Sequence, residues 1–81
     1  MIKVLFFAQT RELLDLDGLD IEPNYATAEE LRAFLCEKGD KWSLALAHGK
    51  LLVAINQTIS PLDSVITDGD EVAFFPPVTG G

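Results

Sequence analysis

The chain has 81 residues, of which 48% are hydrophobic, so it is long enough for one small domain with its own core. Thirteen acidic and six basic side chains give a net charge of −7, which disfavours nucleic-acid and anionic membrane partners. The single cysteine, Cys36, excludes an intramolecular disulfide, and no apolar stretch approaches membrane-spanning length. We therefore predict a soluble, cytoplasmic protein that binds neither nucleic acid nor membrane.

The first half of the chain predicts a strand, a short helix, a second strand and then the principal helix. Residues 1–8 are rich in β-forming side chains, 9–16 could hold one or two helical turns, and a short strand covers 19–21. The clearest helix covers residues 27–39. A capping box, an apolar face and a terminal glycine define it, and these are Thr27 with Glu30, then Leu31, Phe34 and Leu35, then Gly39.

The second half predicts a further short helix, a hairpin and a last strand. The helix covers 41–47, with Asp40 as a possible cap and with Trp42, Leu44 and Leu46 expected at the edge of the core. The hairpin turns at Asn56-Gln57, a weaker turn signal than Asn-Gly, and the last strand covers 72–75.

These elements predict an α+β protein with the β-grasp, or ubiquitin-like, fold. In this fold a mixed sheet carries one principal helix on one face. We expect the domain to cover residues 1–75 and an extended, flexible C-terminal tail to cover 76–81.

Alternation within the strands predicts an apolar cluster on the sheet face away from the helix. Residues an even number of positions apart in a strand point to the same face of the sheet. Phe7 therefore shares a face with Lys3 in the first strand, and Phe75 shares a face with Glu71 in the last strand. Ile59 of the hairpin joins them. Exposed aromatic side chains of this kind indicate a protein-binding patch, unless residues 9–16 fold under the sheet and bury them.

Patterns typical of an enzyme are absent from the sequence. His48 precedes a glycine in a predicted turn and has no Ser or Cys partner nearby, and Cys36 lies beside the apolar stripe of the helix as a structural thiol. The acidic residues, including Asp68 and Asp70, do not have the spacing of a calcium loop. We therefore expect no metal site, no bound cofactor and no catalysis by this chain on its own.

The C-terminal residues form the most distinctive segment. Pro76-Pro77 removes two backbone donors and fixes φ, so the chain should leave the sheet in an extended, polyproline-like geometry. Gly80-Gly81 has no side chains and could pass through a narrow channel. The alternative is a frayed terminus without a function.

Three segments, MIKVLFFAQTREL, KWSLALAHGKLLVAINQT and above all ITDGDEVAFFPPVTGG, carry a close resemblance to a known family. Over essentially its whole length the chain resembles the MoaD family, the small subunits of molybdopterin synthase, which are ubiquitin-like sulfur carriers.

The resemblance implies a sulfur-transfer cycle in molybdenum cofactor biosynthesis. An E1-like adenylyltransferase would use ATP to adenylate the Gly81 carboxylate, and a sulfur donor such as a cysteine desulfurase system would convert it to a thiocarboxylate. The tail would then deliver sulfur to cyclic pyranopterin monophosphate inside the large subunit, in a heterotetramer of two small and two large subunits that supplies the catalytic groups.

The resemblance also implies roles for individual residues of this chain. Gly81 would carry the sulfur, Gly80 and Thr79 would thread the channel, and Val78, Pro77 and Pro76 would set the exit direction. Phe7, Ile59 and Phe75 would dock on a partner, and Arg11 would pair with an acid on the activating enzyme. The alternatives are a thiamine-pathway sulfur carrier, a ubiquitin-like modifier, or a binding module without chemistry.

Overall fold

The computed structural model describes residues 1–46 and 51–76. The predicted order of elements is confirmed, with the bounds β1 Ile2–Phe6, α1 Ala8–Leu14, β2 Gly18–Ile21, α2 Ala28–Cys36, α3 Asp40–Ala45, β3 Leu52–Ile55, β4 Thr58–Ser60 and β5 Glu71–Phe75. No helix within these ranges is long and apolar enough to cross a membrane.

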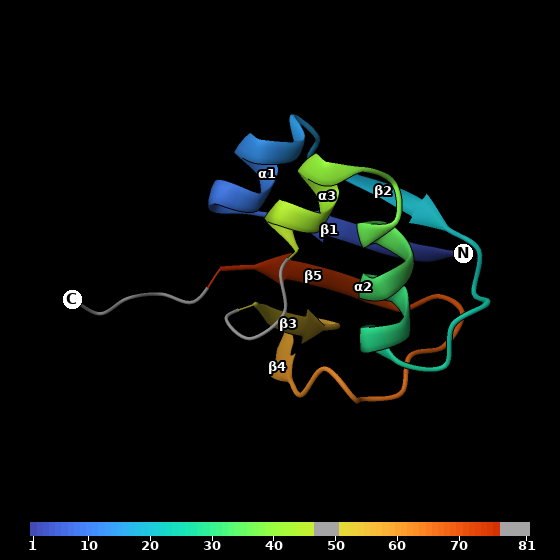
Figure 1. The fold of residues 1–81 in the computed structure, drawn as a ribbon. Coiled ribbons are helices and arrows are strands. Elements are labelled where there is room, and N and C mark those ends of the chain that lie inside the picture. Colours follow the sequence, from blue (N-terminus) through green and yellow to red (C-terminus); the bar gives the residue numbers. More distant parts are fainter. Residues whose placement is uncertain (47–50, 77–81) are drawn as a thin grey trace.

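The five strands form one mixed sheet in the order β2-β1-β5-β3-β4. β1 and β5 pair in parallel, and the other three pairs are antiparallel. The last strand is therefore the central one, with a hydrogen-bonded neighbour on each side. Figure 1 shows the helices on one side of this sheet, which is the arrangement predicted for a β-grasp fold.

The core lies between the sheet and the helices. Alternate strand residues fill it, and they are almost completely buried: Ile2, Val4, Phe6, Val53, Val72 and Phe74. Helices α1 and α2 add Leu14, Leu31 and Leu35 to the same cluster, and Leu46, directly after α3, joins them. Because Leu14 of α1 belongs to this core, residues 9–16 do not fold under the opposite face of the sheet.

The capping of α2 follows the sequence closely. The Thr27 side chain accepts a hydrogen bond from the Glu30 backbone N–H at 3.2 Å, and the Glu30 carboxylate accepts one from the Ala26 N–H at 3.2 Å. The helix ends at Cys36, three residues before Gly39. Gly39 is instead the N-cap of α3, and Asp40 is the first residue of that helix, so the prediction of Asp40 as the cap was wrong.

One of the core residues predicted for α3 is also wrong. Leu44 is 68% exposed, whereas Leu46 is fully buried and Trp42 is half-buried against the core, edge-on to the Phe6 ring at 5.8 Å. The spacing 42, 44, 46 suits one face of a strand, but in a helix residues 42, 45 and 46 share a face. Ala45 accordingly occupies the buried position expected of Leu44.

The predicted hairpin turn is confirmed, and it has an unusual backbone. Asn56 and Gln57 both have positive φ, 51° and 71°, which is the signature of a type I′ turn. Two further bonds tie Asn56 to β5, since its N–H donates to the Glu71 carbonyl at 2.8 Å and its Oδ1 accepts from the Glu71 N–H at 3.0 Å. These contacts fix a turn that the residue types favour only weakly.

Candidate functional site

The predicted tail begins at the end of the central strand. β5 ends at Phe75, and Pro76 is the next described residue. Both residues are half-buried. The other predicted tail residues, Pro77, Val78, Thr79, Gly80 and Gly81, lie outside the described residues, as does His48. Because β5 pairs with β1 on one side and with β3 on the other, the chain reaches Pro76 from the central strand of the sheet.

The sheet face away from the helices, here called the outer face, is organised as three rows of cross-strand neighbours. Residues paired across strands share a face, so the register gives each row directly. The polar row contains Asp20, Lys3, Glu71 and Asn56. The middle row contains Gly18, Leu5, Ala73, Ala54 and Ile59.

The aromatic row is the third, and it lies at the end of the sheet where the chain reaches Pro76. Phe75 pairs with Leu52 of β3. Phe6 pairs with Phe74, and because the Phe7 backbone remains extended, with φ −129° and ψ 159°, the next step of this register places Phe7 beside Phe75. The outer face therefore changes from polar to apolar toward the tail.

The structure brings together three of the predicted partner-binding residues. Phe7 is 45% exposed, Ile59 is 66% exposed and Phe75 is half-buried. They occupy the aromatic row and the adjacent middle row, on the face predicted from strand parity. Leu52 is an addition that the sequence reasoning missed, although its register opposite Phe75 follows once β3 and β5 are paired.

Arg11, the fourth predicted residue, lies in α1 and not on the outer face. Its Nε atom is 3.8 Å from the Asp17 carboxylate, and both side chains are more than half exposed. An exposed ion pair at this distance contributes little to stability, so the pairing does not commit Arg11 to a structural role.

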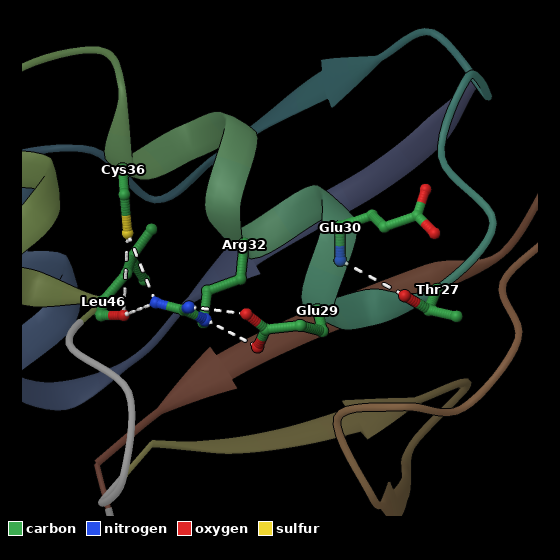
Figure 2. Close-up of polar contacts among 6 residues, drawn as sticks. All are labelled: Thr27, Glu29, Glu30, Arg32, Cys36 and Leu46. Carbon is green, nitrogen blue, oxygen red and sulfur yellow. Dashed lines mark hydrogen bonds and ion pairs between the residues drawn. The ribbon is translucent and has the colours of Figure 1, made fainter.

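Cys36 belongs to a polar network that joins two helices (Figure 2). Arg32 of α2 is only 12% exposed, and its guanidinium donates to both carboxylate oxygens of Glu29 at 2.9 and 2.6 Å. The same guanidinium donates to the Leu46 carbonyl at 2.8 Å and to the Cys36 sulfur at 3.4 Å, while the half-buried Cys36 thiol donates to that carbonyl at 3.7 Å. The network ties α2 to the C-terminal end of α3, which gives Cys36 the structural role that the sequence predicted.

The acidic loop before β5 also has a structural role. The Asp70 carboxylate accepts hydrogen bonds from the Asn56 amide at 3.0 Å and from the Thr67 N–H at 2.8 Å, and these bonds lower the pKa of Asp70. Asp68 forms an ion pair with the Met1 amino group and raises its pKa. Across residues 1–46 and 51–76, no group of three His, Cys, Asp or Glu side chains could hold a metal ion.

Comparison with known sequences identifies a family and close relatives. The profile of the ThiS family matches residues 4–81. The molybdopterin synthase sulfur carrier subunit of Haemophilus influenzae is 64% identical over 81 residues, and that of Escherichia coli is 57% identical. Each alignment covers 100% of both chains.

Comparison with solved structures gives the same group of proteins. The putative molybdopterin converting factor subunit 1 of Pyrococcus furiosus has a TM-score of 0.76 at 28% identity, covering 95% of this chain and 97% of that one. A complex of subunits 1 and 2 of the Helicobacter pylori molybdopterin-converting factor contains a similar chain, with a TM-score of 0.67 at 27% identity and coverage of 99% and 97%.

Proposed function

Because this chain belongs to the ThiS family, we propose that it is the sulfur carrier subunit of a molybdopterin synthase and that Gly81 is the residue that carries the sulfur. The observation that carries this proposal is the similarity to the Haemophilus influenzae carrier subunit over the full length of both chains. The sequence that ends in two glycines and the aromatic row at the end of the outer face next to Pro76 are consistent with this role.

The first chemical step is activation of the Gly81 carboxylate. A free carboxylate is a poor electrophile, so an E1-like adenylyltransferase transfers AMP from ATP to the carboxylate oxygen and releases pyrophosphate. A sulfur donor, such as a cysteine desulfurase system, then attacks the acyl carbon through a persulfide and displaces AMP with the oxygen, and a thiol reductant cleaves the S–S bond of the resulting acyl disulfide. The product is a C-terminal thiocarboxylate.

The second step takes place in the large subunit. The thiocarboxylate sulfur attacks cyclic pyranopterin monophosphate, and water then cleaves the bond between the sulfur and the acyl carbon, which leaves the sulfur on the pterin and restores the carboxylate. A dithiolene needs two sulfur atoms and therefore two loaded carriers, consistent with a heterotetramer of two small and two large subunits. The large subunit supplies the catalytic groups and this chain supplies none.

The architecture of the chain suits delivery of a reactive terminus to an enclosed site. The outer face docks on the partner through Phe7, Ile59 and Phe75. The six residues of 76–81 span at most about 20 Å when extended, which is long enough to enter an active site of another protein. Because the aromatic row adjoins the start of the tail, docking also determines where the tail enters.

Mass spectrometry of the intact protein and of its C-terminal peptide tests the proposal. The chain is incubated with ATP, an E1-like enzyme and a sulfur donor, and the expected product has one oxygen of Gly81 replaced by sulfur and reacts with a thiol alkylating agent. Deletion of Gly80-Gly81 should abolish the product, and Gly81→Ala should reduce it strongly while the protein remains folded. An unmodified tail with demonstrably active partners would refute the proposal.

Mass spectrometry and binding to the large subunit separate the proposal from its nearest alternatives. A ubiquitin-like modifier would appear with Gly81 in an isopeptide bond to a lysine. A docking module without chemistry would bind the large subunit equally well after Gly80-Gly81 is deleted and would never gain sulfur.

A further inference from the structure

The junction between β1 and α1 contains a strained residue beside the aromatic row. Ala8 has a φ of 54°, a region that is unfavourable for any residue with a Cβ atom and is usually occupied by glycine or asparagine. Such conformations persist only where the surrounding structure enforces them, and they concentrate at functional positions. Ala8 immediately follows Phe7, the most N-terminal residue of the predicted docking surface.

The positive φ allows an abrupt change of direction. Phe7 has an extended backbone, which keeps its side chain on the outer face in register with Leu5. Three residues later Thr10 of α1 is almost completely buried, so the chain has already crossed to the helix side of the sheet. The Phe7 carbonyl accepts bonds from the Thr10 and Arg11 N–H groups at 3.2 and 3.4 Å, which ties the two segments together.

We propose that Ala8 is a positioning residue whose backbone conformation holds the Phe7 side chain on the outer face beside Phe75. An alanine restricts this joint more than glycine would, because the left-handed well is narrow for a residue with a Cβ atom. The inference rests on the proposed function, since docking on the large subunit is what the placement of Phe7 serves.

The test compares substitutions that differ in their tolerance of positive φ. Ala8→Asn should change the dissociation constant for the large synthase subunit by no more than about twofold, because asparagine adopts positive φ readily. Ala8→Gly should weaken binding about threefold through added freedom at the joint. Ala8→Val should weaken it about tenfold, because a β-branched residue is an outlier at positive φ and Phe7 is a predicted anchor.

The matched control is Gln9→Val, which introduces the same side chain at the next, exposed helical position. A double-mutant cycle then isolates the role of Phe7: in a Phe7→Ala background, Ala8→Val should cause no further loss of affinity. Equal affinities of Ala8→Val and Gln9→Val for the large subunit would overturn the inference. A loss of affinity caused by Ala8→Val in the Phe7→Ala background would overturn it as well. If Ala8→Val does not fold, the cycle with Ala8→Gly decides in the same way.

A measurement on the free chain keeps this inference separate from the proposed function. The separation of the Phe7 and Phe75 side chains, followed by nuclear Overhauser effects from their β and ring protons, should be the same in the wild-type chain and in Ala8→Asn and should increase in Ala8→Val. Failure of the wild-type chain to bind the large subunit would count against the proposed function. An unchanged separation of the two side chains in Ala8→Val would count against the role of Ala8.

Discussion

The two faces of the sheet differ sharply although they share every strand. In β5, Val72 and Phe74 are completely buried under the helices, whereas their neighbour Phe75 points to the outer face and is half-buried. In β1, Val4 and Phe6 are buried in the same way, and Phe7, which follows the strand, is 45% exposed. All three helices cover one face, so one face specifies the fold and the other is available to a partner.

The largest effect should come from the inner face. Phe74→Ala removes a completely buried ring and should lower the free energy of unfolding by about 3–5 kcal/mol, a large part of the total stability of a small domain. The neighbouring substitution Phe75→Ala removes the same atoms from the outer face and should cost about 1–2 kcal/mol. Urea denaturation measures both, and equal losses would show that the outer face is as much a part of the core as the inner one.

A second prediction concerns a position of the outer face that should not tolerate change. A Cβ atom on Gly18 would lie well inside van der Waals contact of the Val4 carbonyl oxygen and 3.1 Å from Leu5 Cδ2. Gly18→Ala should therefore displace the edge strand β2 and cost about 1–3 kcal/mol.

Gly69 provides the matched control for Gly18. It has a positive φ of 92° but open space around the added atom, so Gly69→Ala reports backbone strain alone, at about 1 kcal/mol. Thermal unfolding compares the two variants. A larger loss for Gly69→Ala would mean that β2 moves aside easily and that its contact with β1 is loose.

The sequence predicted most of the fold because its strongest signals are local. Thr27 with Glu30 and the spacing of Leu31 and Leu35 define α2, and strand parity alone placed Phe7 and Phe75 on the outer face. Pro76-Pro77 and Gly80-Gly81 pointed to the tail, and the family resemblance then gave it a chemical role, although its residues after Pro76 lie outside those the structure describes.

The remaining features depend on contacts between distant segments. The exposure of Leu44 follows from the way α3 packs on the sheet, and the register of Leu52 with Phe75 follows from the order of the strands. The positive φ of Ala8 has no signal in the residue type, since alanine is a strong helix former. Tertiary packing decides all three.

A third prediction uses binding to test the apolar part of the outer face. Ile59→Ala should lower the affinity for the large synthase subunit about tenfold while changing the free energy of unfolding by no more than about 0.5 kcal/mol, because the side chain is already 66% exposed. Val65→Ala is the control, since Val65 is 71% exposed and bridges to Thr27 near the start of α2. Calorimetric titration measures both affinities. An equal loss of affinity for the two substitutions would show that Ile59 of the middle row has no specific role in docking.

The smallest expected effect concerns Asp70, which supports the polar row through its hydrogen bond with Asn56. Hydrogen bonds from Asn56 and then from the Thr67 backbone lower the pKa of Asp70, so its charged form stabilises the folded chain. The stabilisation is fully present above the unfolded pKa of about 3.9 and is lost as the pH falls through the lower, folded value. Asp70→Asn should therefore flatten the dependence of stability on pH below about pH 4, whereas Asp63→Asn on the exposed surface serves as the matched control.

Urea midpoints between pH 2 and pH 6 measure this difference, with the pH range chosen to span the ordinary carboxyl pKa of about 3.9. Because Asp70 is only half-buried and its hydrogen bonds lie at the surface, solvent screens the interaction and the expected change is a modest shift of the midpoint. A profile for Asp70→Asn that parallels the wild type would mean that the Asn56 turn is fixed by its two hydrogen bonds to the Glu71 backbone alone, one from the Asn56 N–H and one to Asn56 Oδ1. Asp70 would then support the hairpin turn through Asn56 without any dependence on its own charge.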